Sequence, residues 1–526
     1  MRYTHDLAPN ESTVNRIVRS IASLSAIALL PLCQPSAREA SASPAGPPAL
    51  VSQIPRFGAV GATAGIAGFA TQPRGVLVVG GTPAGVAAAL AAARHGADVT
   101  LVADSPHLGG VLTDAMMDQW DFNLAPGGAP IEGGIFAEMF ARLGDAFSPD
   151  DAARTFDAMI AAEPRVRVVR DVAPVAVRTI DSPTGRRVAS VTVRDARTGR
   201  TLTLDADVVV DATDAADVAA SAGARFDIGR QDTGIDERTQ AVTLMFALRG
   251  VDWATIVRTY EPIWYGPGGV TERRAWGYSE FAEAYRPLDP MTLVRDLNFG
   301  RLRDGSVTVN AVDLCGVNGL SAADRSRAAR LARREAVALV AYLRTHLPGF
   351  ERARIVRYAR QLYVRETRHI AGLARLTTTD IWQERVPADA IGLSSYPIDL
   401  HAVLPSQPPA FAPVRHVYGI PFGALVPRGL ANLVLASPAI SATHLASGSA
   451  RVVPTTVEEG EAGGVAAATA VREGTDIRSI ALSATRIEAL RATLASGGTI
   501  LARPGPSVVP RAAPALFAAV RNRHRG

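Results

Sequence analysis

The hydrophobic pattern is clearest from residue 75 onward. A short apolar run at 76–79 precedes the turn GGTPAG at 80–85, and an alanine-rich segment follows to about residue 94. Gly96 ends this segment, and a second apolar run occupies 99–102. Short continuous apolar runs are typical of buried parallel strands, and the alanine-rich segment between them favours a helix. The stretch therefore predicts a βαβ unit.

The turn of this unit has the features of a dinucleotide site. Gly80 and Gly81 permit a tight turn, and Gly85 allows the helix and the strand to approach closely. The free N–H groups at the start of the helix would face a pyrophosphate. A glycine-rich turn can also open a helix without binding a ligand, but the strand–helix–strand context favours the dinucleotide site.

Two positions differ from the usual fingerprint. Thr82 stands at the middle glycine of GxGxxG, and Ala103 stands where an acidic residue usually binds the ribose. Asp104 is the next residue, and it takes that role if the second strand ends one position later.

The middle of the chain predicts two further units. Short apolar or alternating runs between 166 and 204 predict a small antiparallel meander inserted in the first domain. The apolar run 208–210 then ends in Asp211-Ala212-Thr213-Asp214, and a polar strand end of this kind lies at the ligand-binding edge of a parallel sheet. From about 240 to 415, partly alternating runs and a long amphipathic helix at 321–347 predict a second, mixed α+β domain.

The last third of the chain returns to the first sheet. Residues 432–436 predict a late buried strand, and GEAGGVAAA at 460–468 predicts a helix of small residues that another element can approach closely. The fold prediction is therefore α/β: a Rossmann-like parallel-sheet domain with an inserted β-meander, plus a second mixed α+β domain.

The N-terminus has the pattern of an export signal. Arg16 and Arg19 precede an apolar run at 21–32, and the small residues Ala40-Ser41-Ala42 follow. We expect a signal peptide at 1–42, a linker at 43–73, and a periplasmic or secreted protein. The alternative is an extension on a cytoplasmic enzyme. No later apolar run is long enough to span a bilayer.

Composition excludes several functions. The chain contains no lysine, which excludes a Walker A lysine and a Schiff-base lysine. The net charge of +5 comes without a basic stripe interleaved with aromatic residues, so we expect no nucleic-acid partner. The two cysteines, Cys33 and Cys315, cannot form a Cys-rich metal site, and we predict no metal. No serine-hydrolase elbow or HExxH motif is present.

Several motifs, taken in order, resemble one known family. They are VVGGTPAG at 78–85, LGGVLT at 108–113, VVVDATDAAD at 208–217, RETRHIAG at 365–372, PIDLH at 397–401, and the segment from IPFG at 420 to GEAGGVAAA at 460–468. Together they resemble the bacterial FAD-dependent oxidoreductases, with the two-part FAD site of the glutathione-reductase-type flavoproteins. The resemblance implies FAD as the cofactor and covers most of residues 74–471.

The resemblance also implies domain boundaries and cofactor contacts. The FAD-binding domain would comprise 74–240 and a closing segment at 416–475, with a substrate or cap domain at 241–415 and a C-terminal helix and basic tail at 476–526. The N-terminus of the helix that contains Gly460 and Gly464 would stabilise anionic reduced flavin through the helix dipole. The implied contacts, with Asp104 as the ribose candidate, are Gly80, Gly81, Gly85, Gly109, Gly110, Thr113, the backbone of Val172, Asp211, Thr213, Gly460 and Gly464.

The candidate catalytic residues are His401, His444 and Arg451. Histidine suits proton transfer near neutral pH, and arginine suits a bidentate grip on a carboxylate. Arg365 and Arg368 are further candidates, although both can instead pair with Glu366, and His401 can belong to a structural turn with Asp399.

The sequence predicts an FAD-dependent dehydrogenase or reductase. It would act on a small organic substrate by hydride transfer to or from flavin N5. The alternative is a secreted flavin-binding protein that has lost catalysis, suggested by Ala103 and by Ser437-Pro438, which replace a glycine and a basic residue of related sequences. The oligomeric state is not predicted.

Overall fold

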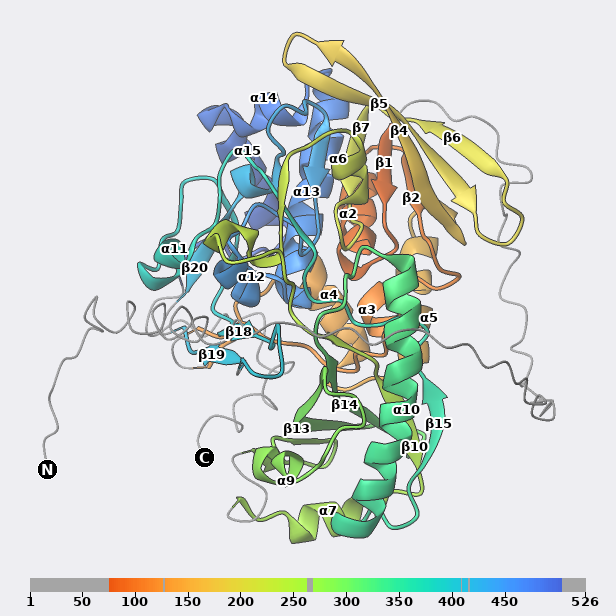
Figure 1. Cartoon of the computed structure of the whole chain (residues 1–526). Helices are drawn as coiled ribbons and strands as arrows, with labels where there is room; N and C mark the ends of the chain where they lie inside the picture. The colour runs from red at the N-terminus through yellow and green to blue at the C-terminus, as the bar shows by residue number, and fades with distance from the viewer. Residues whose placement is uncertain (1–74, 126–127, 263–267, 408, 415–416, 504–526) are drawn as a thin grey trace, which may run out of the picture. The chain divides into compact units, whose positions relative to one another are not determined.

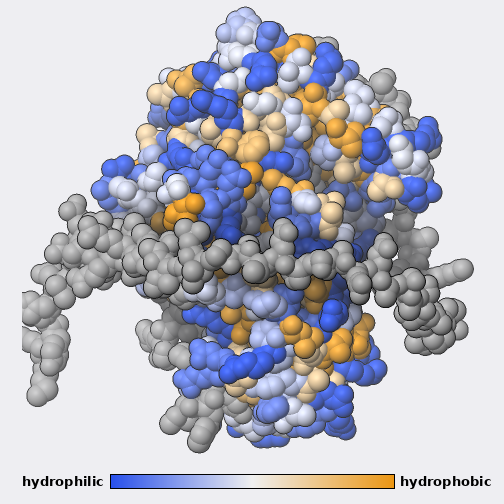
Figure 2. All heavy atoms as spheres, viewed as in Figure 1, coloured by the Kyte–Doolittle hydropathy of each residue, from blue (hydrophilic) through white to orange (hydrophobic). Residues whose placement is uncertain are grey.

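The computed structural model describes residues 75–125, 128–262, 268–407, 409–414 and 417–503 (Figure 1). The predicted signal peptide and linker lie outside the described residues, as does the basic tail from 504 onward. None of the described helices is sufficiently long and apolar to cross a membrane. On the face that Figure 2 shows, hydrophilic residues are spread among smaller hydrophobic patches.

A five-stranded parallel sheet forms the centre of the first domain. Its order is β21 (Leu433–Leu435), β7 (Val208–Asp211), β1 (Val76–Val79), β2 (Val99–Val102) and β3 (Val166–Val169). Each neighbouring pair is parallel. The strands are apolar and almost fully buried near the centre because protein covers both faces. This arrangement confirms the predicted Rossmann-like sheet, including the late strand that returns to it.

The helices α2 (Pro83–Arg94) and α13 (Val453–Glu473) pack closely against each other beside this sheet (Figure 1). A Cβ atom on Gly460 would lie 2.1 Å from the carbonyl oxygen of Ala84, and one on Gly464 would lie 2.3 Å from that of Ala88. Such distances exclude any side chain larger than hydrogen. The small residues of α13 therefore serve the contact with α2, and this contact brings the start of α13 beside the glycine-rich turn.

An antiparallel meander projects from the first domain, as predicted. Its strands β4 (Val172–Ser182), β5 (Gly185–Asp195) and β6 (Thr201–Asp205) lie in sequence order and appear in yellow in Figure 1. The first residue of β4 directly follows the parallel strand β3 and its turn. Because β2 and β3 are parallel, the meander begins on the side of the sheet where the carboxyl end of β2 also lies.

The second domain is built on a seven-stranded sheet and one long helix. The strand order is β11 (Gly269–Val270), β12 (Arg274–Trp276), β13 (Thr292–Arg301), β14 (Val307–Leu314), β10 (Phe246–Arg249) and β15 (Arg354–Tyr358), and β9 (Val242–Thr243) pairs with β14. Helix α10 (Ala322–His346) contacts β14 and β15 and is the predicted amphipathic helix. Ser321 caps its start by accepting a hydrogen bond from the backbone N–H of Asp324.

The remaining described elements are shorter. They are α3 (Gly110–Thr113), α4 (Gly134–Leu143), α5 (Pro149–Ala161), α6 (Asp217–Ser221), β8 (Phe226–Ile228), η2 (Gly229–Thr233), α7 (Trp253–Thr259), α9 (Ser279–Glu283), β16 (Arg368–Ile370), α11 (Thr378–Trp382), β17 (Ala390–Ser394), β18 (Ile398–Leu400), β19 (Ala410–Ala412), β20 (Tyr418–Pro421), η3 (Phe422–Leu425), α12 (His444–Ala450), α14 (Ile477–Ala481) and α15 (Ala484–Ser496). The pairs β16–β8, β17–β20 and β18–β19 form small separate sheets.

The helix contact predicts opposite effects for two neighbouring glycines. Gly460→Ala should lower the free energy of unfolding by about 1–3 kcal/mol, because its Cβ overlaps backbone of α2. Gly463→Ala is the matched control, since its Cβ would lie 3.5 Å from Val434 and alanine favours a helix by up to about 1 kcal/mol. Urea unfolding followed by circular dichroism measures both. Equal stability of the two variants would contradict the proposed close contact.

Candidate functional site

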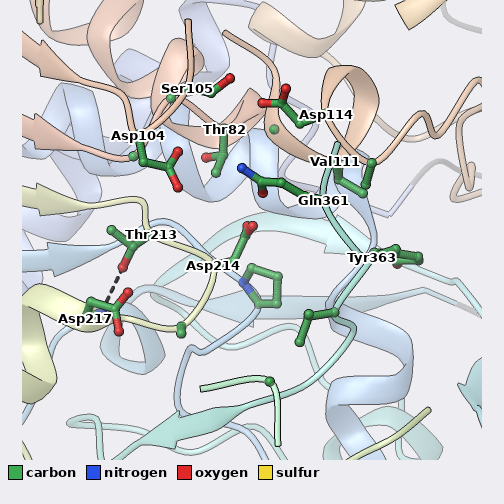
Figure 3. Close-up of a pocket in the computed structure, with 18 of the residues that line it drawn as sticks. Thr82, Asp104, Ser105, Val111, Asp114, Thr213, Asp214, Asp217, Gln361 and Tyr363 are labelled. Atoms are coloured by element: carbon green, nitrogen blue, oxygen red, sulfur yellow. Dashed lines mark hydrogen bonds between the residues drawn. The ribbon is translucent and has the colours of Figure 1, made fainter. Parts of the chain in front are cut away.

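A cavity of about 550 Å³ lies along the carboxyl ends of the parallel strands. Its wall includes the turn after β1, Asp104 after β2, Thr213 after β7 and Ala436 after β21. The second domain contributes residues 360–365, Thr367 and the first turns of α10, and the late chain contributes Arg451 and the start of α13. One cavity thus collects residues from both ends of the described chain and from both domains (Figure 3).

The glycine-rich turn is held by its own threonine. The Thr82 hydroxyl accepts a hydrogen bond from Gly85 N–H at 3.1 Å and donates one to the Ala212 carbonyl at 3.1 Å. Thr82 is therefore the N-cap of α2, which explains why the middle position of the fingerprint tolerates it. Gly80 has a φ of 122°, and a Cβ there would lie 2.2 Å from the Ala212 oxygen. Gly80 and Gly81 line the cavity, whereas Gly85 packs beneath the turn.

The end of β2 places Asp104 in the cavity wall and Ala103 outside it. Ala103 is fully buried, and its side chain faces Gly81. Asp104 points into the cavity beside Thr82 and Asp214 (Figure 3). Desolvation and the neighbouring Asp114 carboxylate raise the pKa of Asp104. The end of β2 therefore presents a carboxylate to the cavity one position after Ala103.

The residues at and after the end of β7 have two roles. Asp211 holds the turn in place, and Thr213 and Asp214 line the cavity. The fully buried Asp211 carboxylate accepts hydrogen bonds from the Thr213 hydroxyl at 2.6 Å and from Ala219 N–H at 2.8 Å. Burial raises the pKa of Asp211 to about 6. Asp211 lies outside the cavity wall, so it shapes the turn that presents Thr213 and Asp214. Desolvation and the charges of Asp104 and Asp217 raise the pKa of Asp214 to about 7.

The LGGVLT motif contributes Gly110 and Val111 to the cavity wall, and Asp114 directly follows the motif. Gly110 lines the cavity, whereas Gly109 packs against Phe156 and the buried Thr113 hydroxyl donates to the Gly110 carbonyl. Asp114, which sequence reasoning missed, lines the cavity and is 1% exposed. Neither of its carboxylate oxygens has a hydrogen-bond partner within the described residues, and Arg360 Nε lies 3.5 Å away. Its position directly after the motif was the only sequence signal.

Val172 lines the cavity as expected, although its backbone N–H already donates to the Ala103 carbonyl at 3.0 Å. The two predicted contacts on α13 lie differently from expectation. Gly460 and Gly464 lie outside the cavity wall, against α2. The cavity residues of α13 are Val453 and Thr456, because the helix begins at Val453 rather than at the glycines. The positive end of its dipole nevertheless faces the cavity, as the resemblance implies.

Of the three candidate catalytic residues, only Arg451 lines the cavity. Its Nη1 donates to the Tyr363 hydroxyl at 2.9 Å, and its Nη2 donates to the carbonyl and the carboxylate of Asp399, both at 3.1 Å. His401 lies behind this pair: its Nδ1 is 2.7 Å from an Asp313 oxygen, and its Nε2 is 3.6 Å from Asp399. His401 is therefore a positioning residue, in contact with Asp399 rather than part of an isolated turn.

His444 belongs to a separate buried cluster. Its Nδ1 is 2.7 Å from a Glu366 oxygen, and His369 Nε2 is 2.9 Å from the same oxygen. None of these three side chains lines the cavity, so the expected catalytic position of His444 is not observed. Glu366 is thus occupied by histidines and does not pair with the arginines on either side of it. Arg368 instead bonds the Ala215 carbonyl and Asp217, each at 2.7 Å.

The residues present fit a flavin dinucleotide. Gly80 and Gly81 leave space for a pyrophosphate at the start of α2, and Asp104 and Thr213 offer polar groups for a ribose on one side. The start of α13 supplies a second helix terminus, which a nicotinamide dinucleotide does not require. Within the described residues, no group of His, Cys, Asp and Glu is suited to hold a metal ion.

Comparison with known proteins identifies the family. The family model for FAD dependent oxidoreductases matches residues 75–494, so the chain belongs to this family and is an enzyme that uses FAD. No curated protein matches the chain.

Similar solved structures share little sequence with it. A geranylgeranyl bacteriochlorophyll reductase-like protein from Thermoplasma acidophilum is 13% identical, with 81% of this chain and 83% of that chain covered and a TM-score of 0.39. The p-nitrophenol 4-monooxygenase PnpA from Pseudomonas putida is 15% identical over 82% and 90%, with a TM-score of 0.39. The flavin-dependent brominase Bmp2 is 11% identical over 80% and 83%, with a TM-score of 0.40.

Asp214 predicts a pH dependence of FAD binding. Its pKa of about 7 makes the carboxyl neutral below that pH and negative above it. Because the pyrophosphate is anionic throughout, FAD affinity should fall roughly five- to tenfold as pH rises through 7. Quenching of FAD fluorescence measures this. Asp214→Asn should remove the step, and the exposed Asp181→Asn should keep it. A step that persists in Asp214→Asn would exclude Asp214 as its origin.

Proposed function

We propose that the enzyme is a dehydrogenase or reductase that transfers a hydride between a small organic substrate and flavin N5. The observation that carries this proposal is the Arg451–Tyr363 pair in the cavity wall. In Figure 3, Tyr363 lies on the side of the cavity away from Asp104 and Asp217. If the ADP half of the cofactor lies along the turn and Asp104, the isoalloxazine ring extends toward Tyr363.

The charges around Arg451 suit a site where negative charge develops. Although burial acts in the opposite direction, the His401 hydrogen bond and the Arg451 charge hold the pKa of Asp399 well below its usual range. Asp399 therefore stays ionised and keeps Arg451 in place while leaving its charge near the cavity. Arg451 and the start of α13 together favour an anionic form of the bound ring system.

The chemistry divides between cofactor and protein. FAD, when bound, accepts or supplies two electrons as a hydride. In the oxidation direction the substrate also loses a proton from oxygen or nitrogen, and the protein must receive it. Tyr363 is the cavity hydroxyl on the ring side, and His401 is partly exposed behind it, so a proton released near Tyr363 lies close to groups that exchange with solvent.

Membership in an oxidoreductase family favours catalysis over the alternative of a flavin-binding protein without activity. The altered positions that suggested this alternative also have local explanations. Asp104, next to Ala103, brings a carboxylate to the cavity wall, and Pro438 forms part of the same wall.

The proposed reaction predicts flavin reduction by a substrate with a transferable hydrogen. FAD-loaded protein, mixed anaerobically with panels of small alcohols, hydroxy acids and reduced nicotinamides, should lose its visible flavin band with at least one donor. Deuteration of the donor C–H should slow this loss, because that bond breaks in the hydride step. The reverse reaction is tested by reoxidation of reduced protein with small carbonyl or alkene acceptors. Bound flavin that no donor reduces and no acceptor reoxidises would favour the non-catalytic alternative.

We also propose that residues 1–42 direct export, on the pattern of the N-terminal sequence. Expression of the full chain in a bacterial host should give a periplasmic or secreted protein that lacks this segment, as intact mass spectrometry would show. A cytoplasmic protein of full mass would contradict the proposal.

A further inference from the structure

Two side chains of the cavity wall, Tyr363 and Arg365, carry hydrogen-bond donors that the described protein does not use. We propose that they form a subsite for an oxyanion of the substrate, such as a carboxylate. This inference rests on the proposed function, and it adds the chemical class of the substrate. Sequence analysis considered Arg365 only as one of two neighbouring arginines and did not consider Tyr363.

Arg365 is buried but only partly satisfied. Its side chain is 1% exposed, and its Nη1 donates to the Ala241 carbonyl at 2.9 Å and to the Thr243 hydroxyl at 2.7 Å. Within the described residues its Nε is buried without a partner, and both hydrogen bonds of the side chain come from Nη1. Nε and Nη2 form the edge of the guanidinium that binds a carboxylate side-on. The Arg365 charge is balanced by Asp313, but a buried N–H group without an acceptor is unfavourable, and at a cavity wall a ligand can supply that acceptor.

Tyr363 presents a donor beside this edge. Its hydroxyl oxygen accepts from Arg451, and within the described chain its own O–H has no acceptor. Two backbone hydrogen bonds with Thr243 fix its main chain, at 2.8 and 3.0 Å. The Arg365 guanidinium lies over the Tyr363 ring, 4.6 Å from its centroid. The two side chains are therefore held together rigidly before any ligand binds.

The local charges favour an anion over a cation or a neutral donor. The subsite offers only donors, which complement a group that only accepts hydrogen bonds. The acids that balance the arginines, Asp313 and Asp399, lie outside the cavity wall, with Asp313 3.5 Å from Arg365 Nη1. On the other side of the cavity stand Asp104 and Asp217 (Figure 3). An anionic substrate is therefore repelled there and attracted to the Tyr363 side, where we place the flavin ring.

The test uses FAD-loaded protein with benzoate as the probe and benzamide as its neutral counterpart. A ligand bound beside the isoalloxazine shifts the visible flavin spectrum, so titration gives a dissociation constant without a known substrate. We expect a saturable shift with benzoate and at least about tenfold weaker binding of benzamide, because only benzoate can form a charge-assisted pair.

Variants assign the effect to the two side chains. Arg365→Gln should weaken benzoate binding by about tenfold or more, Arg365→Lys by less because the charge remains, and Tyr363→Phe by a few-fold. The matched controls are Arg333→Gln and Tyr358→Phe. This second arginine–tyrosine stack, 5.4 Å from guanidinium to ring, lies outside the cavity wall and should leave benzoate binding unchanged.

The outcomes separate this subsite from the proposed function. Protein that takes up no FAD would refute the proposed function. Normal flavin uptake with no benzoate shift, with equal affinity for benzoate and benzamide, or with unchanged affinity in Tyr363→Phe and Arg365→Gln, would refute only the oxyanion subsite. Arg365→Gln also loses the hydrogen bonds to residues 241 and 243 and could fail to fold. In that case the benzoate affinity of Tyr363→Phe tests the subsite, because this variant removes only the hydroxyl of a side chain in the cavity wall.

Discussion

The cavity depends on the close approach of α2 and α13. Helices usually pack 8–10 Å apart, but hydrogen in place of a side chain at Gly460 and Gly464 lets the two backbones come nearer. The approach fixes α13 beside the βαβ unit that begins the described chain, so two helix termini open onto one cavity. A side chain at either glycine would separate them. The site therefore depends on residues that do not themselves line it.

Charge divides the cavity into two sides. Asp104 and Asp214 lie near the glycine-rich turn, and both have raised pKa values because desolvation and neighbouring carboxylates disfavour their ionised forms. On the other side Arg451 is paired with Asp399, whose pKa is lowered. A ligand with uneven charge therefore has one favourable orientation, and this division underlies both the hydride-transfer proposal and the oxyanion subsite.

The second domain both lines the cavity and supports its wall from outside. Asp313 on β14 and His401 after β18 hold Asp399 and Arg365 from outside the cavity, while residues 363 and 365 reach the wall itself. These groups are far apart in sequence, and no spacing rule links them. His444 illustrates the same point, because its place near the start of α13 suggested the cavity, whereas the fold turns its ring toward Glu366.

The sequence alone determined the parallel sheet, the meander, the long helix of the second domain and the identity of the cofactor. Apolar periodicity predicts the strands and helices because each element's buried positions follow its own local repeat, whereas the cofactor is implied by the order of the motifs through their resemblance to the FAD-dependent oxidoreductases. Tertiary structure decided which residues of each motif face the cavity. Asp104 rather than Ala103, Thr456 rather than Gly460, and Tyr363 rather than His444 line it. Which residue lines the cavity depends on where its strand ends and on how its helix is rotated by the element packed against it. A single sequence segment determines neither of these two features.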